Sequence, residues 1–219
     1  ELLDPEMFKG KQYHNAYEFV GLKKGKMSSR KGQVILGNDI LNEANQRITD
    51  VVKSKEDTEL DPEEIEKLAI ASIKYSFLKI SPFKYLAFDM EESVNFEGDS
   101  GPYIEYCYVR AKSILNEANF DKNSIKDIQS LREEEELDLV KKLNEFKEVI
   151  INARKNYSPN LVANYLFDLC QLFNRFYRKH KVIKAEESVR NDRIMLVAAT
   201  SIVIKNGLDL LGIKTVEKM

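Results

Sequence analysis

From about residue 60 onward, apolar side chains recur in alternating steps of four and three, and this spacing narrows the possible folds more than any other feature. The clearest run is Leu139, Leu143, Phe146, Ile150 and Ala153. Such steps place apolar residues on one stripe of an amphipathic α-helix. Because 43% of the 219 residues are apolar, the chain can bury these stripes in a core. We therefore predict a mainly α protein built around a bundle of antiparallel helices.

Start and stop signals set the helix bounds. Asp61 and Pro62 supply a cap and a first-turn proline, Ser81-Pro82 ends that helix, and Gly212 can provide a left-handed cap at the end of the last one. The expected helices cover residues 39–52, 61–80, 102–118, 131–155, 158–176 and 188 (or 191) to 211. The stretch 83–96 gives no clear signal.

The first 60 residues follow a different pattern. Residues 16–22 and 33–36 look like short strands on either side of a glycine-rich basic segment. The cluster of turn residues at 97–102 is the best candidate for a domain boundary. The sequence therefore predicts a first region over residues 1–97 and a helical domain over residues 98–219.

The basic segment between Glu18 and Asp39 contains no carboxylate. It holds four of the nine glycines and five cations: Lys23, Lys24, Lys26, Arg30 and Lys31. Glycine lets backbone N–H groups approach a ligand closely, and dense positive charge suits a polyphosphate. On charge alone, a solvated basic loop or a nucleic-acid patch is the commoner interpretation.

The order of residues favours the polyphosphate. The run Lys26-Met27-Ser28-Ser29-Arg30 resembles the Lys-Met-Ser-Lys-Ser signature of class I aminoacyl-tRNA synthetases, and the following Lys31-Gly32 makes it most similar to the arginyl branch. In that family the loop closes over ATP and stabilises the departing pyrophosphate. The resemblance implies ATP contacts from Lys26, Met27, Ser28, Ser29, Arg30 and Lys31, with catalytic roles for Lys26, Ser28, Arg30 and Lys31. The family has a lysine where this chain has Ser29, so Arg30 or Lys31 would supply the missing charge.

Two later stretches resemble the same family, in the same order. Phe96-Glu97-Gly98 and Gly101-Pro102-Tyr103, followed by Tyr106 and Arg110, are similar to the junction between the catalytic region and the anticodon-binding domain. Tyr103, Tyr106 and Arg110 share one helix face, which could contact RNA or pack against a neighbour. Residues 207–219 resemble the end of that domain, which implies that Met219 lies against the anticodon loop.

Aromatic and basic residues alternate along the expected helix at residues 158–176 and in the residues that follow it. Single-stranded RNA is bound by stacking of bases on aromatic rings while cations hold the phosphates. Phe173 and Phe176 fall on the buried stripe, whereas Tyr177, Arg178 and Lys181 lie nearer the polar face. His180 is expected to titrate in solvent. The predicted tRNA-binding residues are Tyr165, Tyr177, Arg178, Lys181, Arg190, Arg193 and Met219.

Other motifs are missing from the sequence. His14 and His180 are the only histidines, and neither lies in the His-x-Gly-His-like motif that grips ATP in class I enzymes. Cys107 and Cys170 are isolated within apolar helical patterns, which indicates reduced core thiols of a cytosolic protein. No metal site and no membrane span are predicted. The chain opens with Glu1 rather than Met, and we interpret it as a fragment.

The resemblance implies the carboxy-terminal part of an arginyl-tRNA synthetase: the end of a Rossmann-like catalytic domain, with short strands around the ATP loop, followed by the anticodon-binding bundle. The intact enzyme would be a cytoplasmic monomer that uses ATP, with magnesium held mostly by its other half, to join arginine to its tRNA. This chain alone is not expected to activate arginine. The alternatives are the same part of a cysteinyl or methionyl enzyme, a stand-alone tRNA-binding module, and a helical scaffold that binds only protein.

Overall fold

The computed structural model describes residues 4–11, 13–23, 36–53, 60–121 and 128–219. Helices dominate these ranges, as the sequence predicts. The long helices are α2 (Gly37–Lys53), α3 (Pro62–Leu78), α5 (Gly101–Glu117), α6 (Glu134–Asn156), α7 (Asn160–Lys179) and α8 (Glu187–Leu210), with short helices α1 (Pro5–Phe8) and α4 (Met90–Ser93).

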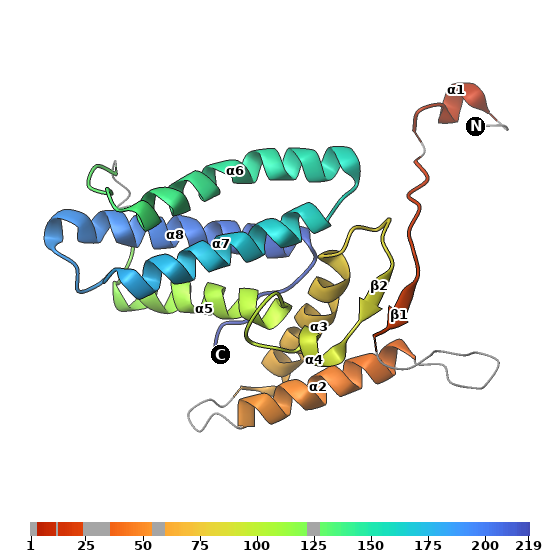
Figure 1. Cartoon of the computed structure of the whole chain (residues 1–219), viewed down its shortest axis with the longest axis horizontal. Helices are drawn as coiled ribbons and strands as arrows, with labels where there is room; N and C mark the ends of the chain where they lie inside the picture. The colour runs from red at the N-terminus through yellow and green to blue at the C-terminus, as the bar shows by residue number, and fades with distance from the viewer. Residues whose placement is uncertain (1–3, 12, 24–35, 54–59, 122–127) are drawn as a thin grey trace.

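Helices α5 to α8 form an antiparallel bundle (Figure 1). In it, α6 packs along α7 and α5 packs along α8. The predicted stripes face inward, since Leu139, Leu166, Phe173, Phe176 and Ile204 are fully buried. Burial of side chains of this size is the main force that holds such a bundle together. Cys107 and Cys170 are free and lie in the same core, where the sequence places them.

The helix ends are set by local hydrogen bonds. At α3 the Asp61 carboxylate accepts from the Glu63 amide at 2.7 Å, and at α5 the Ser100 hydroxyl accepts from the Tyr103 amide at 3.3 Å. These contacts satisfy amides that have no partner inside the helix. Gly212 adopts a φ of +67° just after α8, the left-handed conformation predicted for it.

The amino-terminal part contains the strands. Strand β1 (Val20–Leu22) pairs in parallel with β2 (Leu86–Phe88), with Val20 opposite Leu86. The predicted strand at 16–22 is therefore shorter than expected, and β2 arises in the stretch that gave no clear signal. Residues 33–35 lie outside the described ranges. Leu36 belongs to no strand and instead precedes α2, where its amide donates to the Asp39 carboxylate at 3.0 Å.

Helices α2 and α3 pack together, and α3 packs in turn on α5. Gly101 lies at this second contact, so close to α3 that a Cβ atom there would come within 2.5 Å of the Ala71 carbonyl oxygen. The buried side chains from Ala44 to Val216 form one core, so the turn predicted as a domain boundary joins two parts that pack against each other. Residues 4–11 and 13–17 extend away from this body, although the Tyr13 ring stacks on Tyr157 at 4.0 Å between centroids. The chain joins the body at Glu18, whose amide donates to the Pro82 carbonyl at 2.8 Å.

Candidate nucleic-acid interface

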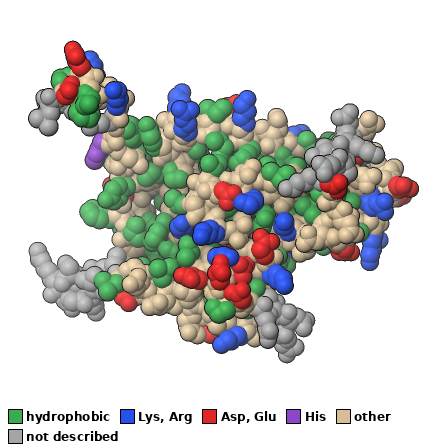
Figure 2. All heavy atoms as spheres, turned by 180° about the vertical axis from the view of Figure 1, so that it is seen from behind, with side chains coloured by type: hydrophobic (Ala, Val, Ile, Leu, Met, Phe, Trp, Pro, Cys, Tyr) green, Lys and Arg blue, Asp and Glu red, His purple; other side chains and the backbone are tan. Residues whose placement is uncertain are grey.

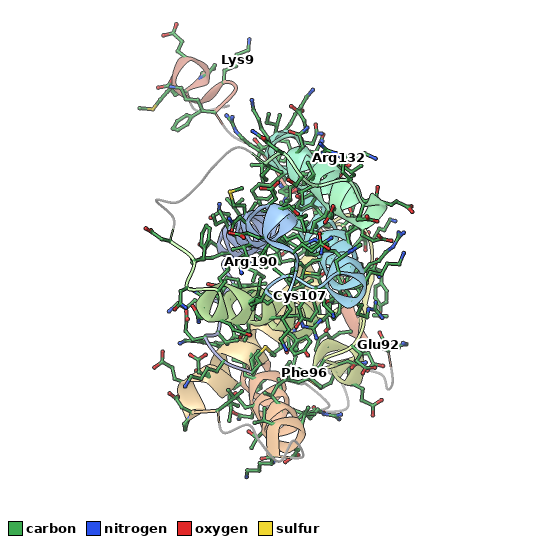
Figure 3. All side chains as sticks on the ribbon, turned by 90° about the vertical axis from the view of Figure 1, so that its left-hand side faces the viewer. Lys9, Glu92, Phe96, Cys107, Arg132 and Arg190 are labelled. Atoms are coloured by element: carbon green, nitrogen blue, oxygen red, sulfur yellow. The ribbon has the colours of Figure 1, made fainter. Side chains whose placement is uncertain are left out.

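The end of α7 and the residues after it form a basic surface with one exposed aromatic ring. Tyr177 is 40% exposed, and Arg178, Lys181 and Lys184 are exposed beside it. These residues line a hollow of about 510 Å³ that reaches Ile114 and Glu117 on α5. Arg190 lies half-buried in the first turns of α8 at the same end of the bundle, which faces the viewer in Figure 3. An aromatic face beside several cations has the chemistry that binds single-stranded RNA.

A hydrogen-bonded network holds the Arg110 guanidinium against the Tyr177 ring. The Arg110 guanidinium carbon lies 4.4 Å from the Tyr106 ring centroid and 5.2 Å from that of Tyr177. The same guanidinium donates to the Tyr106 hydroxyl at 2.6 Å and to the Asn174 side-chain oxygen at 2.5 Å. Asn174 donates to the Tyr103 hydroxyl at 2.9 Å. The shared face of Tyr103, Tyr106 and Arg110 thus packs against α7, one of the two roles left open by the sequence.

The neighbouring cations are held by Glu135 at the start of α6. Its carboxylate, only 4% exposed, accepts from Arg175 at 3.1 Å, from Lys179, and from His180 Nε2 at 3.0 Å. The Lys179 ammonium, followed by the His180 ring, lowers the pKa of Glu135 to about 2. The expected place of His180 in solvent is wrong, because its side chain is only 13% exposed and lies against this carboxylate.

Arg193 is engaged in the same way by the next residue of α6. Its Nε donates to Glu136 Oε1 at 2.7 Å and its Nη1 donates to the Lys181 carbonyl at 2.8 Å. The second oxygen of Glu136 accepts from the Arg132 and Glu133 amides at 2.8 and 3.0 Å. Arg193 therefore ties α8 and the loop before it to α6, and we leave it out of the RNA surface for which the sequence suggested it.

Tyr165 also departs from its predicted role. Its side chain is 3% exposed, its hydroxyl donates to the Lys142 carbonyl at 2.8 Å, and its ring packs 5.5 Å from that of Phe146. Burial raises the pKa of the hydroxyl, and the ring belongs to the contact between α6 and α7. Tyr165 therefore presents no face to a base. Met219, by contrast, is half-buried and packs against the core.

Residues 26–31, predicted to contact ATP, lie outside the described residues. The last described cation before them, Lys23, pairs with Glu92 and with Asp89 at 3.9 Å, and the Glu92 hydrogen bond is the main cause of its raised pKa. The Lys23 amide donates to the Phe88 carbonyl at 2.9 Å and so continues the β1–β2 pairing. The basic segment therefore starts at the carboxyl ends of two parallel strands.

A hollow of about 200 Å³ opens beside these strand ends. Ligands of parallel sheets commonly bind at this edge. Its apolar wall comes from Leu22, Ile40, Phe88 and Met90, and its polar wall from Glu43, Arg47, Asp89 and Glu91. With three carboxylates beside one guanidinium, the polar wall is net negative and does not suit a triphosphate. In the described part of the chain, no group of three His, Cys, Asp or Glu side chains could hold a metal ion, and no helix is long and apolar enough to cross a membrane.

Known proteins resemble this chain both in sequence and in structure. Residues 104–219 match the DALR anticodon binding domain family. The chain is 40% identical to the arginine–tRNA ligase of Thermococcus kodakarensis and 34% identical to that of Halothermothrix orenii. Each match covers 94% of this chain, and it covers 34% of the first protein and 37% of the second. It also superposes on the arginyl-tRNA synthetase of Thermus thermophilus with a TM-score of 0.85 at 33% identity, over 94% of this chain and 35% of that one. The chain thus spans about a third of the length of the relatives it matches.

Proposed function

This chain belongs to the arginyl-tRNA synthetase family, whose DALR anticodon binding domain it carries, and we propose that it supplies the tRNA-binding helices and the ATP loop of an arginine–tRNA ligase. In that enzyme, ATP activates arginine and the arginyl group passes to its tRNA. The observation that carries the proposal is the placement of Tyr177, Arg178 and Lys181 on one accessible surface within the matched domain.

The proposed tRNA surface comprises Tyr177, Arg178, Lys181, Arg190 and Met219. The Tyr177 ring would stack on an anticodon-loop base while the exposed cations hold phosphates. Tyr177 is already fixed over Arg110, so little side-chain entropy is lost when a base stacks on it.

For the ATP loop we propose the roles that the resemblance implies, with Lys26, Ser28, Arg30 and Lys31 stabilising charge on the departing pyrophosphate. Met27 and Ser29 complete the ATP contacts. The hollow beside β1 and β2 would take the base, since its apolar wall fits one and its carboxylates repel phosphates. Magnesium would neutralise phosphate charge, held mostly by the nucleotide-binding half of the enzyme.

Exposed aromatic side chains support the existence of such a half. Tyr17 and Phe19 are 84% and 82% exposed beside a two-stranded parallel sheet, and Phe83 and Tyr85 are also more than half exposed. Figure 2 shows hydrophobic side chains gathered at this edge, below the amino-terminal arm. Parallel sheets are normally covered on both faces. We propose that residues 1–97 complete a nucleotide-binding domain, that residues 98–219 form the anticodon-binding domain, and that the intact enzyme is a cytoplasmic monomer while this chain alone is inactive.

Filter binding tests the proposal. The chain should bind arginine tRNA more tightly than other tRNAs, and its affinity should fall steeply with salt, as for any protein that contacts phosphates. Equal affinity for all tRNAs, or none, would overturn the proposal. Adding the nucleotide-binding half of the Thermococcus kodakarensis ligase should restore arginylation. Selective binding without restored activity would instead favour the stand-alone tRNA-binding module.

A further inference from the structure

The last residues of the chain form an ordered segment that runs back across the molecule. After Gly212 turns the chain, residues 213–219 leave α8 and lie against α3 and α5 rather than continuing into solvent. Ile213 is 1% exposed and Val216 is fully buried. Both belong to the same core as the side chains of α3 and α5. In Figure 1 the chain end accordingly lies beside α5 and α3.

Three polar contacts fix this segment, and they come from two different helices. The Val216 amide donates to Glu105 Oε2 on α5 at 3.1 Å, and the Glu217 amide donates to Glu64 Oε2 on α3 at 2.8 Å. The Lys74 ammonium on α3 donates to the Gly212 carbonyl. The segment is therefore bound to α3 on one side and to α5 on the other.

Glu105 is the unusual member of this set. It is fully buried, and its other oxygen, Oε1, has no hydrogen-bond partner among the described residues. Burial of a carboxyl group is costly unless it accepts hydrogen bonds or is protonated. Neither the tRNA surface nor the ATP loop uses this residue. The contact that accounts for a carboxyl group at this core position is the one to the Val216 amide.

We propose that residues 212–219 act as a strap that couples α3 to the anticodon-binding helices, and that Glu105 is the positioning residue that fixes the strap and hence the place of Met219. Without the Glu105 acceptor, the Val216 amide would be buried and unpaired, so the strap would lift and take Met219 with it. The part of this inference that concerns tRNA rests on the proposed function. The coupling of α3 to the bundle does not.

Amide hydrogen exchange of the whole chain, read by NMR, tests the strap without RNA. Glu105→Leu removes the acceptor at similar volume and should speed exchange of the Val216 and Glu217 amides by about tenfold or more, the equivalent of one lost hydrogen bond. Glu105→Gln keeps a neutral acceptor and should leave both rates unchanged. Unchanged rates in the leucine variant, or equal effects of both substitutions, would overturn the proposal.

If Glu105→Leu does not fold, Lys74→Met provides the test, since it removes only the contact to the Gly212 carbonyl at the surface. It should speed exchange at Ile213 and Val216 and leave the α6 amides as they are. A uniform rise over the whole chain would count against a separate strap.

Measurements of tRNA binding test the part of the inference that concerns Met219. Glu105→Leu and deletion of Met219 should weaken arginine tRNA binding by similar factors, and the double variant should be no worse than either. Additive losses would show that Glu105 does not act through Met219. If the unchanged chain binds no tRNA but the exchange results hold, the proposed function fails and the strap stands.

Discussion

The Arg110 guanidinium on α5 lies 5.2 Å from the centre of the Tyr177 ring on α7. Cation–π contacts of this kind contribute about 0.5–1 kcal/mol at exposed sites. One face of the ring is thus occupied inside the protein, while 40% of the side chain remains exposed. The accessible part of Tyr177 is therefore presented from a fixed position, with Arg178 next to it in sequence.

Replacing Tyr177, Arg178 and Lys181 together by alanine should weaken tRNA binding roughly ten- to a hundredfold, through loss of one stacked base and two phosphate contacts. Filter binding at moderate salt measures the effect. The matched control is alanine at Tyr157, Arg154 and Lys155, which are also exposed but lie at the end of α6, away from the end of α7 that carries Tyr177. Equal effects of the two triple variants would rule out this surface.

Arg193 and Arg190 should have opposite phenotypes. Arg193→Met leaves the buried Glu136 carboxylate without its cation and should lower the free energy of unfolding by about 3 kcal/mol. Arg190→Met should change stability by less than about 1 kcal/mol but weaken tRNA binding. Urea denaturation and filter binding separate the two effects. The reverse pattern would mean that Arg193, not Arg190, faces the RNA.

Gly101→Ala should destabilise the contact between α3 and α5 by about 1–3 kcal/mol, because the new Cβ would lie 2.5 Å from the Ala71 carbonyl oxygen. Gly37→Ala is the control, since a Cβ at that position meets no atom within 4 Å. Thermal denaturation compares them. Equal midpoints would show that α3 is not packed this closely on α5.

Stability should fall as pH rises because of Glu105, whose burial raises its pKa to about 8. The folded state keeps a proton that the unfolded state releases above its pKa of about 4.3, so the free energy of unfolding decreases between these two values. Three titratable groups face Glu105, and each adds only negative charge when ionised: Glu64 on α3, Asp209 on α8 and Cys170 on α7.

Denaturation of the Glu105→Gln variant isolates this effect. The variant should lack most of the decrease in stability between about pH 4.3 and 8, since glutamine does not titrate. An unchanged pH profile would show that Glu105 is not protonated in the folded chain.

Protonation of Glu135 affects stability in a different pH range. Because its pKa is lowered to about 2, the stability that it contributes is lost only as pH falls below about 4.3.

In an enzyme that joins this chain to its nucleotide-binding half, Arg30→Ala should slow formation of arginyl adenylate more than it weakens ATP binding. The reason is that Ser29 stands where the family has a lysine, so Arg30 would meet charge that develops only in the transition state. Pyrophosphate exchange measures both quantities, with Lys24→Ala as the control for a neighbouring charge. A change confined to ATP affinity would contradict the transition-state role.

The sequence predicts what depends on local pattern. The Asp61 cap, the Gly212 turn and the stripe through Phe173 and Phe176 all follow from nearby residues, and the structure confirms them. Strand β2 was not predicted, because three residues carry no usable periodicity and β1 lies 66 positions earlier in the pairing register.

The site was predicted less completely for the same reason. The partner of Arg193 is Glu136, 57 positions away, and no local pattern distinguishes a cation with a buried partner from one in solvent. Tyr165 shares the aromatic-basic pattern of Tyr177, yet α6 covers it. The buried Glu105 gives no sequence signal at all, since the helix around it looks like any amphipathic helix.

Glu135 and Glu136, at the start of α6, reduce the positive electrostatic field that attracts a polyanion from solution. Of the cations between residues 175 and 193, Arg175, Lys179 and Arg193 already have carboxylate partners on α6. The attractive field is therefore narrower than the row of basic residues suggests, and it points outward from Arg178, Lys181 and Lys184. An incoming polyanion would be guided to the end of the bundle that carries these three residues rather than spread along the length of the bundle.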